Sequence, residues 1–144
     1  MELSRYIPQL RHPGGQLYTG GQPGPQAWTA LAKAGVHTVI NLRPSSETPG
    51  RDEAAEVRAA GLTYVNVPIE GPGTLGRGPV SALWQALDGI KGPVLVHCGS
   101  GNRCGAMLAL AEAWHRGAEP GEALEAGRRA GLTGWEPEVR KLLG

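Results

Sequence analysis

The stretch that decides the fold is VLVHCGSGNRCG, residues 94–105. A run of β-branched and apolar residues comes first, and Cys98 follows it at the start of a turn that contains two glycines. Such a run, bounded by turn residues, predicts a buried strand. Arg103 closes the turn and Cys104 comes next. On this pattern alone four roles are open for Cys98: a nucleophile, a sulfur carrier, a metal ligand or one half of a disulfide.

Composition limits the setting in which this cysteine acts. The chain has 144 residues and a formal net charge of +1, so we expect a single domain over residues 1–144 and no general affinity for nucleic acid. No apolar run approaches the roughly 18 residues that cross a bilayer, and the first residues resemble no signal peptide. These features predict a soluble, cytoplasmic protein without a membrane partner. The sequence does not specify the oligomeric state.

The two cysteines favour reactive thiols over structural bonds or metal ligands. Cys98 and Cys104 are six positions apart, too close to join distant parts of a chain, and a reducing compartment disfavours a permanent disulfide. They also lack the Cys-x-x-Cys spacing of zinc sites, and the histidines are scattered. We therefore expect no metal and no organic cofactor.

Alternating strand and helix patterns predict an α/β fold. The expected strands occupy 16–23, 36–42, 62–69 and 93–97, and the expected helices occupy 24–35, 51–61, 79–90, 104–117, 120–131 and 135–144. This order predicts a mostly parallel central sheet with helices on both faces. Ligands bind such sheets outside the carboxyl ends of the strands, which is where the Cys98 turn lies.

The turn itself has the composition of an oxyanion site. The residues between Cys98 and Arg103 are Gly99, Ser100, Gly101 and Asn102. Two glycines allow successive backbone N–H groups to turn inward, and the following helix adds the positive end of its dipole. Arg103 can bind two oxygens of a tetrahedral anion, and the same field favours the thiolate of Cys98. The alternative is an inert cysteine beside a glycine-rich turn.

This turn resembles the signature of the protein tyrosine and dual-specificity phosphatases, in which His-Cys begins a phosphate-binding loop that ends with arginine. The matching residues are His97, Cys98, Gly101 and Arg103. Most of that superfamily has five residues between cysteine and arginine, whereas this chain has four. Four is also the spacing of many rhodanese sulfurtransferases. The loop alone leaves both families open.

A second segment distinguishes them. LYTGGQPGPQAWTALAKAGVHTVINLRPSSE, residues 17–47, resembles the opening of the beta-lactamase-hydrolase-like phosphatase family, small bacterial domains related to the dual-specificity phosphatases. The residues that carry the likeness are Thr19, Gly20, Gln22, Pro23, Asn41, Leu42, Arg43 and Pro44. The resemblance extends over about residues 16–116, and the strand-end and turn motifs of rhodaneses are absent.

The resemblance implies a dual-specificity-phosphatase-like fold and a phosphatase that hydrolyses phosphate monoesters through a phosphocysteine at Cys98. Its partner would be a phosphorylated substrate, either a phosphoprotein or a small phosphate ester. Two alternatives stay open: a sulfurtransferase that carries a Cys98 persulfide, and an anion-binding domain without catalysis.

The relatives also suggest roles for residues around the loop. Their general acid lies in a loop that corresponds here to residues 67–78, and Glu70 is the only carboxylate of that stretch, with a solvated loop glutamate as the alternative. His97 is expected to order the loop. Arg43 is expected either to pair with Glu47 or to support the loop.

Cys104 replaces the serine or threonine that often follows the arginine, and its thiol is a weaker donor. We hypothesise that Cys104 traps oxidised Cys98 as a disulfide, which would make the site reversibly sensitive to oxidation. The alternative is a thiol that only packs within the first turn of its helix.

Overall fold

The computed structural model describes residues 3–90 and 92–144 and contains a five-stranded sheet in the order β1-β2-β5-β3-β4. The strands are β1 (Arg11–Gly14), β2 (Leu17–Gly20), β3 (Thr38–Asn41), β4 (Thr63–Asn66) and β5 (Val94–His97). All neighbouring pairs are parallel except β1 and β2. The predicted mostly parallel sheet is therefore confirmed.

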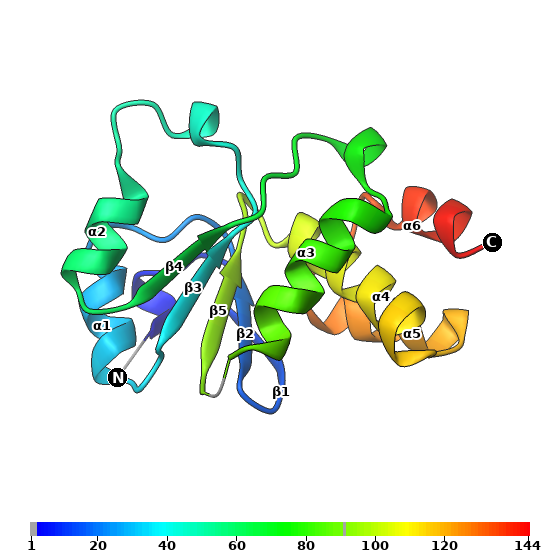
Figure 1. Ribbon diagram of the computed structural model, residues 1–144, viewed down its shortest axis with the longest axis horizontal. Coiled ribbons are helices and arrows are strands. Elements are labelled where there is room, and N and C mark those ends of the chain that lie inside the picture. Colours follow the sequence, from blue (N-terminus) through cyan, green and yellow to red (C-terminus); the bar gives the residue numbers. More distant parts are fainter. Residues whose placement is uncertain (1–2, 91) are drawn as a thin grey trace.

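Helices cover both faces of this sheet, as predicted (Figure 1). One face carries α1 (Ala27–Lys33) and α2 (Glu53–Ala59), and the other carries α3 (Arg77–Asp88), α4 (Asn102–Arg116), α5 (Pro120–Arg129) and α6 (Glu136–Leu143). Three short 3-10 turns complete the described structure: Leu3–Arg5, Ser45–Glu47 and Pro72–Thr74. No helix of the described chain is long and apolar enough to cross a membrane.

Strand β5 contributes side chains to the hydrophobic cores on both faces of the sheet. Because side chains alternate along a strand, Val94 and Val96 face the α3–α6 side while Leu95 faces α1 and α2. All three side chains are buried. This central strand is therefore held from both sides, and the turn that follows it at Cys98 begins from a rigid position.

Two local features differ from the sequence-based expectation. Strand β1 was not predicted, because it contains Pro13 and Gly14 and lacks alternating apolar residues; its place at the sheet edge tolerates proline. Helix α3 begins at Arg77, two residues before the expected start at Pro79. Proline is accepted there because the first N–H groups of a helix have no partner within the helix.

Helices α4 and α5 approach each other backbone to backbone. A Cβ atom on Gly105 would lie 2.1 Å from the nitrogen of Leu132, and one on Gly127 would lie 2.8 Å from the Cβ of Ala109. Only glycine fits at these positions. The hydroxyl of Thr19 also donates to the carbonyl of Ala130, which fixes the end of α5 against β2.

Candidate active site

The Cys98 loop lies between the end of β5 and the start of α4, at the carboxyl edge of the sheet. Gly101 has a φ of +92°, a left-handed conformation that favours glycine and turns the chain into α4. The loop is also paired with the end of β2: the N–H of Cys98 donates to the carbonyl of Gly20 and the N–H of Gln22 to that of Gly99. The predicted strand–loop–helix unit is present.

Cys98 is buried at the base of this loop, and its sulfur accepts hydrogen bonds. The N–H of Gly101 lies 3.0 Å from Cys98 Sγ, and Cys104 Sγ lies 3.6 Å away with its thiol as donor. The Cys104 thiol contributes most to lowering the pKa of Cys98 to about 5, and the N–H groups of Cys104, Ser100 and Gly101 add to this against the effect of burial. Cys98 is thus a thiolate at neutral pH.

Cys104 has the opposite character. Burial, together with the hydrogen bond and charge of Cys98, raises the pKa of the Cys104 thiol well above its ordinary value. It therefore keeps its proton and acts as a donor. Its sulfur also lies 3.3 Å from the carbonyl of Val96, so the thiol sits between the strand end and the nucleophile.

Arg103 is held by two acceptors on one side. Its Nη1 donates to Glu47 Oε2 at 3.0 Å and to the carbonyl of Ile69 at 2.9 Å, and its Nη2 donates to Glu47 Oε1 at 2.9 Å. Three of the five guanidinium N–H groups are used in this way. The other two, on Nε and Nη2, share one edge, and Nη2 lies 3.2 Å from the position of a Cβ on Gly99. Within residues 3–90 and 92–144 no hydrogen bond uses that edge, so it can bind two oxygens of an anion beside the loop.

Glu47 is the residue that fixes Arg103, and it comes from the 3-10 turn after β3. Arg43 Nε also donates to its carboxylate, at 2.8 Å. Hydrogen bonds from Arg103 are the largest cause that lowers the pKa of Glu47, and Arg43 adds to it. Glu47 is therefore ionised at neutral pH and serves as an acceptor. Of the two alternatives for Arg43, the structure shows the pair with Glu47, and the link from Arg43 to Arg103 runs through that carboxylate.

His97 and Glu53 form a buried pair directly behind the nucleophile. His97 Nε2 lies 2.6 Å from Glu53 Oε2, and His97 Nδ1 lies 3.4 Å from the carbonyl of Cys98. Burial raises the pKa of Glu53, but the hydrogen bond and charge of His97 and the hydrogen bond of Gln22 outweigh it, so the net shift is downward. His97 thus connects Glu53 to the backbone of the loop.

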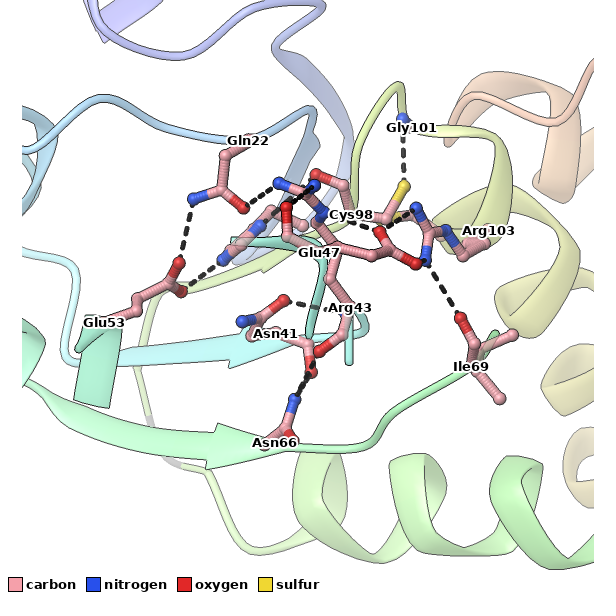
Figure 2. Close-up of polar contacts among 12 residues, drawn as sticks. Gln22, Asn41, Arg43, Glu47, Glu53, Asn66, Ile69, Cys98, Gly101 and Arg103 are labelled. Carbon is pink, nitrogen blue, oxygen red and sulfur yellow. Dashed lines mark hydrogen bonds and ion pairs between the residues drawn. The ribbon is translucent and has the colours of Figure 1, made fainter. Parts of the chain in front are cut away.

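Asparagine side chains stabilise the neighbouring strand ends (Figure 2). Asn41 Oδ1 accepts from the N–H of Arg43 at 2.8 Å, and Asn66 donates to the carbonyls of Asn41 and Arg43. Together they hold the chain turn from which Arg43 extends toward Glu47. Glu53, Asn66 and the bridging role of Gln22 were not predicted, because each contact joins residues more than 20 positions apart in the chain.

The remaining predicted residues occupy different places. Glu70 is exposed beside Ile69, and the described residues include no hydrogen-bond partner for its side chain. Ser100 is exposed on the loop. The side chain of Asn102 points away from the anion position and accepts from the N–H groups of Thr133 and Trp135. Within residues 3–90 and 92–144 no group of three or more His, Cys, Asp or Glu residues is arranged to hold a metal.

Several solved structures share this fold, and some of them are named putative phosphatases. A putative phosphatase from Shewanella putrefaciens is 28% identical, with a TM-score of 0.76 over 98% of this chain and 95% of that chain. P. aeruginosa TpbA in complex with pTyr has a TM-score of 0.69 over 96% of this chain and 88% of that chain; at 21% identity it shows the shared fold. The fold and loop thus define a phosphatase-like α/β domain.

The sequence comparison is more specific. Residues 14–115 match the model of the beta-lactamase hydrolase-like protein, phosphatase-like domain, and the chain belongs to this family. A beta-lactamase hydrolase-like protein of Xylella fastidiosa is 39% identical over 101 residues, which is 67% of this chain. The match spans 23% of the length of that relative.

Proposed function

We propose that the chain is a cysteine-dependent phosphatase that hydrolyses phosphate monoesters. The observation that carries the proposal is the buried Cys98 beneath the loop, whose pKa is lowered to about 5 and which is therefore a thiolate. Beside it, the described hydrogen bonds of Arg103 leave the edge formed by Nε–H and one N–H of Nη2 able to bind two oxygens of an anion. Cys98 Sγ would attack phosphorus and displace the ester oxygen, forming a phosphocysteine that water then hydrolyses to inorganic phosphate. Arg103 and the loop N–H groups would stabilise the equatorial oxygens of both transition states.

The leaving oxygen needs a proton, and the carboxylates near the site differ in their ability to supply it. Arg103 and Arg43 keep Glu47 ionised, so it has no proton to give. Glu53 is buried and paired with His97, away from a leaving group. Glu70 is exposed, and the carbonyl of its neighbour Ile69 binds Arg103, so its side chain can reach a leaving group above the loop. We therefore assign the general acid to Glu70.

Cys104 supports the second step of this reaction. When water attacks the phosphocysteine, Cys98 leaves as a thiolate and regains negative charge. A protonated donor 3.6 Å from that sulfur stabilises the charge as it forms. We extend the proposal to a cytoplasmic enzyme, because Cys98 and Cys104 can work as a thiolate and its thiol donor only where a reducing environment keeps them unbonded.

The proposed substrate class is an aryl phosphate ester, either in a phosphoprotein or in a small molecule. Support comes from the bound pTyr of TpbA, which shares the fold. With substrates of this class, we propose an enzyme of the protein tyrosine or dual-specificity phosphatase type.

The direct test is hydrolysis of p-nitrophenyl phosphate by the native protein, Cys98→Ser and Arg103→Ala, with Arg5→Ala as the control for loss of an exposed arginine. We expect turnover that vanadate inhibits, abolished in Cys98→Ser, strongly reduced in Arg103→Ala and unchanged in Arg5→Ala. Equal turnover in native protein and Cys98→Ser would overturn the proposal. Rapid formation of thiocyanate from thiosulfate and cyanide, without ester hydrolysis, would instead establish a sulfurtransferase.

A further inference from the structure

A continuous series of hydrogen bonds leaves the loop at the nucleophile and returns to it at the arginine (Figure 2). Its members, in order, are Cys98, His97, Glu53, Gln22, Arg43, Glu47 and Arg103. Six of these seven residues have ionisable side chains, and one of the six is the nucleophile Cys98. The seventh, Gln22, is a neutral amide at the middle of the series, and neither the family resemblance nor the proposed mechanism gives it a role.

The two ends of the Gln22 amide meet opposite charges. Its Oε1 accepts from Arg43 Nη1 at 2.7 Å, and its Nε2 donates to Glu53 Oε1 at 2.8 Å. A guanidinium only donates and a carboxylate only accepts, so this position needs one group that does both. An amide does so without adding charge.

Gln22 is also anchored to the loop through its backbone. Its N–H donates to the carbonyl of Gly99 at 3.4 Å, next to the nucleophile, and Gly21 forms a β-bridge with Ser100. Gln22 therefore contacts the loop through its backbone. Through its side chain it also contacts Glu53, which holds His97, and Arg43, which holds Glu47. Arg43 in turn holds Glu47, which holds Arg103 on two nitrogens.

We propose that Gln22 is a positioning residue that sets the orientation of Arg103 by coupling the His97–Glu53 pair to the Arg43–Glu47 pair. This inference rests on the proposed phosphatase function for its kinetic consequences. Its structural part, a dependence of anion binding at Arg103 on the Gln22 amide, holds for any oxyanion that the loop accepts.

Two variants separate the amide's roles. Gln22→Met keeps the length of the side chain and removes the hydrogen bonds to Arg43 and Glu53, together with a third from Nε2 to the carbonyl of Pro23. It should lower kcat/KM for p-nitrophenyl phosphate by about 10- to 100-fold and weaken binding of inorganic phosphate at all pH values, because a misplaced catalytic group costs this much. Gln22→Glu keeps the acceptor for Arg43 but places a second carboxylate against Glu53.

Two carboxylates in contact share a proton at low pH and repel once both ionise, since one of their pKa values is strongly raised. The kcat/KM of Gln22→Glu, divided by that of the native protein, should therefore fall as the pH rises above about 5. The same ratio for Gln22→Met should show no such fall. Gln85→Glu, on the exposed face of α3, adds the same charge away from the site and should give a flat ratio.

The experiment measures the pH dependence of kcat/KM and, by calorimetry, phosphate binding for all four proteins, with melting curves to establish folding. A flat ratio for Gln22→Glu, or native phosphate affinity in a folded Gln22→Met, would overturn the role of Gln22. Should Gln22→Met fail to fold, the Gln22→Glu ratio decides. A native protein that binds phosphate but hydrolyses no ester would refute the phosphatase function, while the binding series would still decide the role of Gln22.

Discussion

Replacing Cys104 with alanine should make the nucleophile less acidic without touching it. The Cys104 thiol is the largest single cause that lowers the pKa of Cys98 to about 5. A hydrogen bond to a charged group is worth about 1.5–3 kcal/mol, and one pKa unit corresponds to roughly 1.36 kcal/mol. Loss of this donor should therefore raise the pKa of Cys98 by about one to two units.

The sign of the effect on rate follows from the thiolate being the attacking form. With a pKa of about 5, about 99% of Cys98 is thiolate at neutral pH, so native kcat/KM should rise up to about pH 5 and then stay level. In Cys104→Ala the rising limb should move to about pH 6–7. The loss of rate is then large in acid and small at neutral pH.

The assay is the pH profile of kcat/KM for p-nitrophenyl phosphate, read together with the ultraviolet absorbance of the thiolate. Cys104→Ser is the matched control, because its hydroxyl restores a donor of similar size and should return the limb to the native position. The reasoning is wrong if the limbs of Cys104→Ala and the native protein coincide, or if the native limb lies at the pKa of an ordinary thiol.

Three further predictions concern the other groups at the site. Glu47→Gln should weaken phosphate binding by about tenfold or more, measured by calorimetry, because Arg103 loses a charged partner; unchanged binding would show that Ile69 alone positions it. Glu70→Gln should slow an alkyl phosphate about 10²–10⁴-fold and p-nitrophenyl phosphate much less, and equal losses would remove Glu70 as the acid. Peroxide should convert Cys98 to a sulfenic acid that the Cys104 thiol attacks with loss of water, giving a disulfide. Reductant should then restore much more activity in the native protein than in Cys104→Ser, whose sulfenic acid can oxidise further, and equal recovery would exclude the pair.

The sequence was sufficient for the parts of the molecule whose signals are local. The β-branched run before Cys98, the two glycines and the following apolar helix predicted the order β5, loop and α4, although α4 begins at Asn102, two residues before the expected start. Strand β1 gave no such signal, because its pairing with β2 depends on the edge of a sheet that the other strands must first form. Pro13 and Gly14 make its sequence unlike that of an ordinary strand.

The candidate site likewise contains residues with a local sequence signal and residues that only the fold brings together. Cys98 and Arg103 could be proposed from the sequence because they lie five positions apart, one in the loop and one in the first turn of α4, and their roles stay predictions. Glu53 looked like an ordinary acidic residue in the first turn of a helix, yet it reaches His97 across 44 positions, and Glu47 reaches Arg103 across 56. Periodicity and spacing describe neighbours along the chain and carry no information about such pairs.

The close contact of α4 with α5 bears on where this domain can be cut. The region of family similarity ends at residue 115, but Asn102 binds the N–H groups of Thr133 and Trp135, and Gly105 packs against Leu132. A recombinant fragment that stops at the limit of similarity would contain every chemical group of the site and yet expose the buried side of α4. We therefore expect the unit that folds to be larger than the unit that sequence similarity outlines, and a fusion junction that preserves the shape of the loop to lie beyond α6.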